Sequence, residues 1–256
     1  MLQIRSEQMK VFEEVALKNF KDEMVQHLNR FAAKHCEIIG EEKVRETIQL
    51  GITDAQKYGL TNRGPVRFYI EMMFMFGSSF DTDPQYPWAV AILNDQTAYD
   101  QMDRAELLHQ AMLTYLEKVA GSDNIHSITA LRRIRERVDR PVTSSNDSFG
   151  NDMLREMKGI YPQKCSYVGD EPLKELIHQG MKSAKLHSMQ HLRGSMLFVV
   201  LMFALGHGFA DDPLFPWIGK TLADPLVVDP EKKAERIEKK AITYLNSVLA
   251  YHDKQR

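Results

Sequence analysis

Apolar residues recur at spacings of three and four along most of this chain, which is the period of an amphipathic helix. The clearest run comprises Met9, Phe12, Ala16, Phe20, Met24, Leu28 and Phe31. With Ser6 as a plausible N-cap, this run predicts one long helix that continues to about Lys34 and turns a single apolar stripe toward the core. We find no alternating pattern of the kind that marks a strand or hairpin. The sequence therefore predicts an all-α protein.

Further helices follow from the same spacing. In the first half we expect helices over 41–58 and 66–76, a short helix from Pro87, and a last helix capped by Asp103. Glycines at 59 and 77 mark helix ends. In the second half we expect helices over 125–138, 171–186, 190–205, 216–222 and 230–251. The pattern thus predicts five helical segments in each half.

Two sixteen-residue segments, 73–88 and 202–217, carry the same residue at eight positions, and the second begins 129 residues after the first. The same interval pairs Cys36 with Cys165 and Trp88 with Trp217, which are all the cysteines and tryptophans of the chain. We therefore expect an internal duplication of two similar helical repeats, packed with pseudo-two-fold symmetry. Repeat one is expected over 1–122 and repeat two over 123–256, two normal domain lengths.

We interpret the repeated segment as structural. Its glycine suits a helix end, its Asp-Pro pair a turn, its second proline the first turn of the next helix, and its aromatic residues can hold the connector on the core. The positions concerned are Gly77, Phe80, Asp83, Pro84, Pro87, Trp88, Gly206, Phe209, Asp212, Pro213, Pro216 and Trp217. The aspartates at 81, 83, 211 and 212 resemble the start of a cation loop, but no closing glutamate follows at the required spacing.

Function is sought where the two repeats differ. Residues 139–150 contain Pro141 and a run of Ser, Asn and Asp, so they should break the first helix of repeat two as a linker or functional loop. His187 and His191 are four residues apart, which is the spacing of a metal-binding pair and places both on one face if the helix is continuous. The intervening Ser-Met-Gln lacks the glutamate of zinc proteases. His207 replaces Ser78 directly after a helix, where the helix dipole favours a histidine.

Composition narrows the function classes. The net charge is −2, which gives no global field for nucleic acid or an anionic membrane, so we expect a protein or small-molecule partner. The longest apolar stretch, 196–205, is well short of the roughly 20 residues that span a bilayer. The N-terminal residues have no signal-peptide pattern. We expect a cytoplasmic protein whose two cysteines are buried free thiols.

No motif of a known active site occurs. The chain has no nucleophile elbow, phosphate loop, dinucleotide fingerprint or Cys-X-X-Cys pair. We therefore assign no catalytic residue and no cofactor, and we do not expect an enzyme. An unrecognised metal-dependent enzyme that uses His187 and His191 remains the alternative.

The segment from Arg67 to Trp88, preceded by Lys57-Tyr-Gly-Leu-Thr-Asn-Arg63, resembles a group of bacterial proteins encoded beside spike and effector genes of the type VI secretion system. The resemblance implies an accessory protein that binds a bacterial effector or toxin. It could act as an adaptor or co-chaperone before the effector is loaded. The alternative is an immunity protein that neutralises a cognate toxin. The oligomeric state stays open.

Overall fold

The computed structural model describes residues 6–95, 100–138 and 148–254, and within these ranges the chain forms thirteen α-helices and no strand. The expected all-α fold is confirmed. The helices of the first half are α1 Ser6–Phe31, α2 Ala33–Ile39, α3 Glu41–Lys57, α4 Arg63–Phe76, α5 Pro87–Asn94 and α6 Gln101–Tyr115. Those of the second half are α7 Ile125–Val138, α8 Phe149–Ile160, α9 Pro162–Val168, α10 Asp170–Leu186, α11 Leu192–Leu205, α12 Pro216–Leu222 and α13 Pro230–Lys254.

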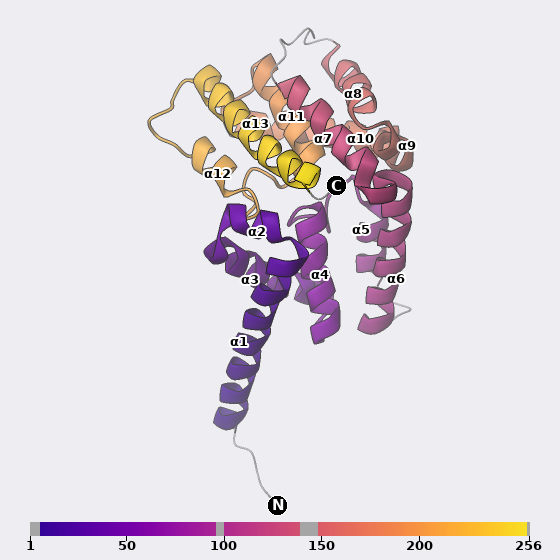
Figure 1. The fold of residues 1–256 in the computed structure, drawn as a ribbon, viewed down its shortest axis with the longest axis vertical. Helices are drawn as coiled ribbons and strands as arrows, with labels where there is room; N and C mark the ends of the chain where they lie inside the picture. The colour runs from indigo at the N-terminus through magenta and orange to yellow at the C-terminus, as the bar shows by residue number, and fades with distance from the viewer. Residues whose placement is uncertain (1–5, 96–99, 139–147, 255–256) are drawn as a thin grey trace, which may run out of the picture.

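The helices of the first half lie below those of the second in Figure 1. A π-helical turn over Leu116–Ala120 and a 3-10 turn over Ser122–Asn124 connect α6 to α7. α11 is the most completely buried element, with ten buried residues among its fourteen. It packs against α7, α8, α10 and α13. The core of the second half is therefore built around α11, as the apolar composition of this helix predicts.

Three consecutive helices recur at the interval of the repeated segment. α2, α3 and α4 have the same lengths as α9, α10 and α11, and each begins 129 residues before its counterpart. The backbone agrees as well. Gly40 has φ 81° and ψ 159° where Gly169 has 85° and 167°. Gly77 has φ 98° and ψ 152° where Gly206 has 100° and 156°.

The halves differ at their beginnings. α1 is one unbroken helix, whereas the second half has α7 and α8 in its place. The break expected over 139–150 falls partly outside the described residues, since 139–147 are not among them. Its last two residues, Phe149 and Gly150, belong to α8.

Several expected helix boundaries differ from the structure. α4 begins at Arg63 rather than at 66, α11 at Leu192 rather than at 190, and α13 ends at Lys254 rather than at 251. The helix predicted to reach Lys34 ends at Phe31, because Ala32 leaves the helical region with φ −131° and a new helix starts at Ala33. The N-cap of α6 is Asp100 rather than Asp103. The Asp100 carboxylate accepts hydrogen bonds from the N–H groups of Met102 and Asp103, which are two of the donors that a helix start leaves free.

Glycines let neighbouring helices approach closely in both halves. A Cβ at Gly51 of α3 would lie 2.6 Å from Ile70 Cγ1 of α4. A Cβ at Gly180 of α10 would lie 2.7 Å from Val199 Cγ2 of α11. Both distances are shorter than any packed side chain tolerates, so these two helix pairs depend on glycine.

Cys36 and Cys165 are free and buried, as expected. Burial raises the pKa of each thiol to about 11, so neither is a reactive thiolate at neutral pH. None of the described helices is both long and apolar enough to pass through a lipid bilayer.

Candidate functional site

The two halves meet where α4 and α11 end. Gly77 follows α4 and Gly206 follows α11, and both have positive φ. A Cβ on Gly77 would lie 2.8 Å from the carbonyl oxygen of Leu205. A Cβ on Gly206 would lie 3.0 Å from the carbonyl oxygen of Phe76. The two backbones therefore touch at these glycines, which we call the glycine contact.

Two buried aspartates bridge this contact in opposite directions. Asp83 Oδ2 accepts a hydrogen bond from the N–H of His207 at 2.7 Å, and Asp212 Oδ2 accepts one from the N–H of Ser78 at 2.8 Å. The second oxygen of each aspartate holds its own turn. Asp83 Oδ1 accepts from the N–H of Gln85 and Asp212 Oδ1 from that of Leu214. The turn role was anticipated from sequence, whereas the bond across the halves was not.

The remaining residues of the repeated segment pack around these turns. Phe80 and Phe209 are fully buried. Pro87 and Pro216 occupy the first positions of α5 and α12, directly after the turns that contain Pro84 and Pro213. Trp88 and Trp217 are partly buried, and the indole Nε1 of each is buried without a hydrogen-bond partner among the described residues.

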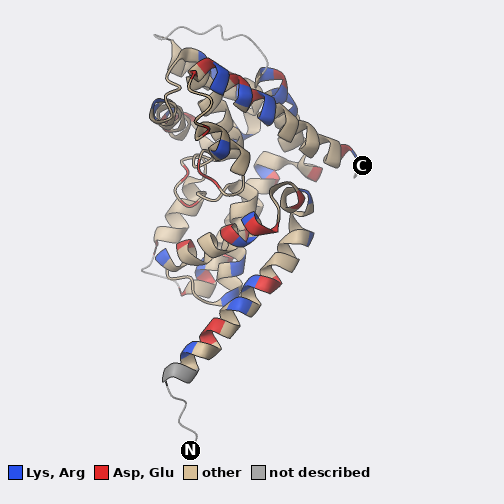
Figure 2. Cartoon of the chain, turned by 90° about the vertical axis from the view of Figure 1, so that its left-hand side faces the viewer, with Lys and Arg blue, Asp and Glu red and all other residues tan. Residues whose placement is uncertain are grey.

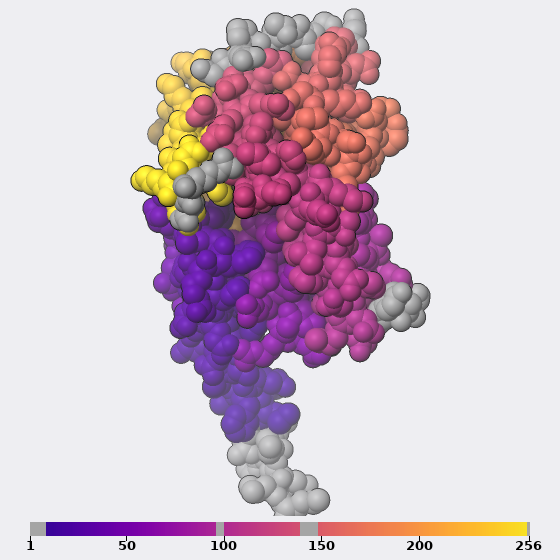
Figure 3. Space-filling view, turned by 45° about the vertical axis from the view of Figure 1, so that its right-hand side comes forward, coloured from indigo at the N-terminus to yellow at the C-terminus, as the bar shows by residue number. Residues whose placement is uncertain are grey.

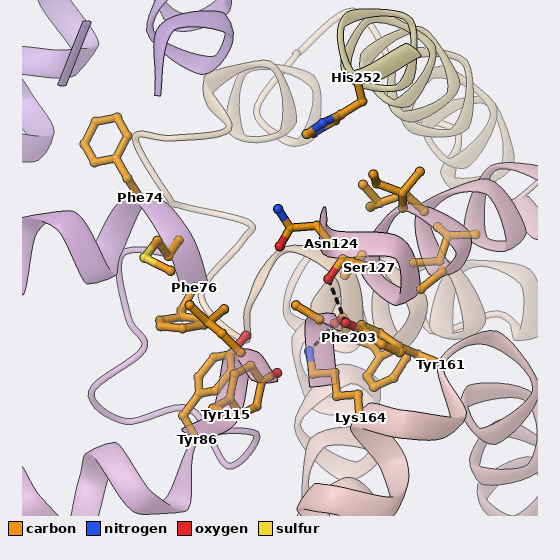
Figure 4. A pocket seen from close by; sticks show the side chains of 18 of the residues that line it. Phe74, Phe76, Tyr86, Tyr115, Asn124, Ser127, Tyr161, Lys164, Phe203 and His252 are labelled. Atoms are coloured by element: carbon orange, nitrogen blue, oxygen red, sulfur yellow. Dashed lines mark hydrogen bonds between the residues drawn. The ribbon is translucent and has the colours of Figure 1, made fainter. Parts of the chain in front are cut away.

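A cavity of about 470 Å³ lies beside the glycine contact. Its walls come from both halves and are mainly apolar and aromatic. Figure 4 shows Lys164 and the pair Tyr86 and Tyr115 at one end, and His252 of α13 at the other. Phe31 and Met75 on its rim are exposed, whereas Lys164 is 5% exposed. The cavity therefore runs from an exposed apolar rim to a buried cation, and its volume is typical of small-molecule sites.

Lys164 of α9 is held by one carbonyl and two aromatic rings. Its ammonium donates a hydrogen bond to the carbonyl oxygen of Phe203 at 3.0 Å. Nζ also lies 4.8 Å from the ring centroid of Phe203 and 5.4 Å from that of Tyr86. Burial lowers the pKa of Lys164 to about 8, because the charged form loses its hydration.

His35 of α2 occupies the position 129 residues before Lys164. Its ring lies 6.0 Å from Phe74, 5.5 Å from Phe215 and 6.2 Å from Tyr244. The aromatic residues of the two environments are also 129 residues apart. The pairs are Phe74 and Phe203, Tyr86 and Phe215, and Tyr115 and Tyr244. The glycine contact is thus flanked by two similar aromatic environments, one around an imidazole and one around an ammonium. The cavity next to His35 is smaller, about 150 Å³.

The three histidines identified from the sequence, His187, His191 and His207, lie in three different surroundings. His187 and His191 do not share a helix face, because α10 ends at Leu186 and α11 begins at Leu192. The condition for a shared face, one continuous helix through both residues, is therefore not met. His187 packs on Phe198 with ring centroids 5.6 Å apart, and His191 Nε2 lies 3.5 Å from Glu231 Oε1. Within the described ranges, no group of three or more His, Cys, Asp or Glu side chains could hold a metal ion.

His207 lies between the halves. Its Nε2 lies 3.0 Å from Thr82 Oγ1 of the first half, and its Nδ1 lies 3.1 Å from Gln179 Oε1 of α10. Together with its N–H bonded to Asp83, this places His207 in the contact between the halves rather than in a free site.

A second candidate site is the free part of α1. Residues 9–19 are exposed without exception, and burial begins only at Phe20. Figure 3 shows this part of the helix standing clear of the body. It carries Met9, Phe12 and Val15 at spacings of three, and Val11 four residues before Val15, so the four lie along one broad side of the helix. We call these four residues the α1 apolar face. Phe12 is the most exposed of the four, at 64%.

Lys164 is the site residue that sequence reasoning missed. It lies in Pro162-Gln-Lys-Cys-Ser-Tyr-Val168, a segment without any motif. The available signal was the interval of the repeat, which pairs this lysine with His35 and places both one residue before a buried cysteine. Comparison of the chain with known proteins finds no relative. No protein-family model, no curated protein and no solved structure matches it.

Proposed function

We propose that this protein is a cytoplasmic accessory protein that binds another protein through the α1 apolar face, and that its partner is a type VI secretion effector which it serves as an adaptor or co-chaperone. The observation that carries the proposal is the unpartnered apolar face at the projecting end of α1. The identity of the partner rests on the resemblance of residues 67–88.

The continuity of α1 supports a docking role. The C-terminal part of this helix packs against α2, α3 and α4 through buried Phe20, Met24 and Leu28. The apolar pattern then continues past the edge of the body, where no described residue covers it. Fully burying a valine or phenylalanine stabilises a complex by about 1.5–3 kcal/mol, so four such residues provide a substantial driving force. Large exposed apolar patches typically mark interaction sites.

The surroundings of the face indicate the partner's chemistry. Lys10, Glu13, Glu14 and Lys18 share the exposed part of α1 with the apolar face, so both signs of charge lie next to it. Figure 2 shows this alternation along the projecting helix. A partner of matching chemistry offers an apolar groove with a rim of mixed charge, the arrangement in which amphipathic helices commonly bind.

We also propose that the body is an internal duplication packed about a pseudo-two-fold axis. The reciprocal bonds support this. Ser78 and His207 are 129 residues apart, as are Asp83 and Asp212, and each N–H donates to the aspartate of the opposite half. A two-fold relation requires contacts of this kind, in which residue i touches j and the counterpart of i touches the counterpart of j.

The test is co-expression of the full chain with the products of its neighbouring genes, followed by co-purification. We expect a stable complex with the effector. The double variant Phe12→Ser, Val15→Ser should abolish it without unfolding the protein, because both side chains are exposed. The matched control is Leu226→Ser, which removes an equally exposed apolar side chain, 89% exposed, far along the chain.

The outcomes of this test distinguish an adaptor from an immunity protein. A complex that also recruits the spike supports the adaptor. A complex that abolishes the toxicity of the effector without recruiting the spike supports the immunity alternative instead. Binding that survives the double variant, or failure of every neighbouring product to bind, overturns the proposal. Self-association through α1 is checked by light scattering of the wild type and the double variant, and a dimer lost in the variant would also overturn it.

A further inference from the structure

The cavity beside the glycine contact contains a buried cation that has no direct ion-pair partner among the described residues. The carboxylate of Asp83 acts on Lys164 electrostatically and raises its pKa, but its oxygens accept hydrogen bonds from the N–H groups of His207 and Gln85. Within the described ranges Lys164 makes no ion pair, and its one hydrogen bond goes to a neutral carbonyl. Buried ammonium groups are normally paired with a carboxylate or bound to several acceptors, because losing hydration is costly. Two aromatic rings offset only part of this loss, since the attraction of a cation to a ring face is weaker than the hydration it replaces.

The His35 environment shows what a closed version of this site looks like. There the aromatic side chains surround an uncharged ring, and Tyr244 Oη lies 3.3 Å from His35 Nδ1. The space left over is about 150 Å³, against about 470 Å³ beside Lys164. The two environments have matching aromatic positions but differ in charge and in room. The environment that contains the buried cation is therefore also the one with space for a ligand.

The shape of the cavity sets the orientation of an occupant. The rim, with Phe31 and Met75, is exposed and apolar, and the cation lies at the buried end. Of the described residues that line the cavity, Lys164 is the one with a full positive charge at pH 7. A single cation matches a single negative charge, whereas a phosphate dianion would need further donors. Apolar and aromatic walls match a hydrocarbon or aromatic body.

We propose that this cavity binds a small monocarboxylate with an apolar body, whose carboxylate pairs with Lys164 Nζ and whose body lies between the aromatic walls toward the rim. The site is separate from the α1 apolar face. The inference therefore does not rest on the proposed function, and it makes the protein a receptor for an apolar acid as well.

The test is isothermal titration calorimetry of the full chain at pH 7 with octanoate and 3-phenylpropionate. The matched probes are 1-octanol, which keeps the body but not the charge, and octylamine, which reverses the charge. We expect at least one of the two acids to bind, at least tenfold more tightly than either matched probe. Lys164→Met, similar in length but uncharged, should weaken acid binding at least tenfold and leave 1-octanol unchanged.

Three further variants keep the result decisive. Lys158→Met removes an exposed lysine that pairs with Asp170, and it should bind the acids as the wild type does. Ala204→Phe fills the cavity from α11, and it should remove binding of acid and alcohol alike. Lys164→Gln keeps a donor for Phe203 O and serves if the methionine variant fails to fold.

Several results overturn the inference. One is equal affinity of the acids for the wild type and for the folded Lys164 variants. Another is octylamine binding as tightly as octanoate. The third is the absence of any heat from both acids up to millimolar concentration. Because none of these variants touches α1, loss of effector binding in the Phe12→Ser, Val15→Ser protein leaves this test unaffected.

Discussion

Asp83 and Asp212 each accept a hydrogen bond from a backbone N–H group of the opposite half. The carboxylate of Asp83 accepts the N–H of His207, and that of Asp212 accepts the N–H of Ser78, at 2.7 and 2.8 Å. Both N–H groups directly follow the glycines that end α4 and α11. Charge-assisted bonds of this length are among the stronger hydrogen bonds in proteins. The junction of the halves therefore depends on these two side chains.

Replacing either aspartate by alanine should strongly destabilise the fold. Asp83→Ala leaves the N–H groups of His207 and Gln85 without their acceptor in a buried place, and we expect a loss of about 3 kcal/mol in the free energy of unfolding. Asp212→Ala should cost a similar amount. The double variant should lose less than the sum, because both residues serve one contact. Urea denaturation of the four proteins measures this, and strict additivity would contradict a shared contact.

Alanine at Gly77 should be far worse than alanine at Gly40. Both glycines have positive φ, 98° and 81°, together with an extended ψ, so both substitutions carry the strain of a backbone conformation almost confined to glycine, about 1–3 kcal/mol. At Gly40 the new Cβ meets no atom within 4 Å, whereas at Gly77 it meets Leu205 O at 2.8 Å. We expect Gly77→Ala to cost at least about 2 kcal/mol more, since overpacking adds to the strain. Equal shifts of the melting temperature would show that the backbones can separate without cost.

The protein should lose stability as the pH falls from 6.5 toward 4, and His35 should account for part of that loss. Burial lowers the pKa of His35 to about 4, against 6.5 in an unfolded chain. Between these values the unfolded chain binds the proton and the folded one does not, so acid favours unfolding by about 3 kcal/mol in total.

His35→Phe should flatten this part of the profile, while the exposed His178→Gln should leave it unchanged. The measurement is the free energy of unfolding at pH 7, 6, 5 and 4. An identical acid slope in wild type and His35→Phe would show that the ring is hydrated in solution.

Lys164→Met should raise stability at neutral pH. The wild type keeps a buried charge there, and apolar replacements of buried charges are often stabilising by about 1–4 kcal/mol. The folded pKa of about 8 lies below the unfolded value of 10.5, so the unfolded chain binds more protons between them. Wild-type stability should therefore rise from pH 8 toward 9.5, and that of the variant should not. A variant less stable than the wild type at pH 7 would contradict the view that burial of the Lys164 ammonium costs more than its contacts return.

Local helix signals could be predicted well from sequence. Gly77, Gly206, Pro87 and Pro216 begin or end helices where their backbone preferences place them, because each acts within its own turn. The expected cap at Asp103 lies three residues too late, because Asp100 also precedes apolar residues and only the backbone geometry assigns the cap to it.

Contacts between distant segments could not be predicted in this way. The periodicity of α1 indicates that something covers its apolar residues, but it does not say whether that is this chain or another molecule, and Met9 and Phe12 proved exposed. Lys164 has no sequence signal of its own, since its role arises from Phe203 and Tyr86, which are 39 and 78 residues away. The reciprocal bonds of Asp83 and Asp212 likewise depend on how the halves pack.

The glycine contact has a consequence for how such a chain could have originated. Under the proposed duplication, each half carries both an aspartate that reaches outward and an N–H that needs one. A single ancestral half would then have possessed everything required to pair with an identical copy of itself, as in an isologous homodimer. Fusion of the two genes would have made the pairing permanent. The residues on the two sides of the glycine contact would then have been free to diverge. One side now carries the imidazole of His35 and the other the ammonium of Lys164.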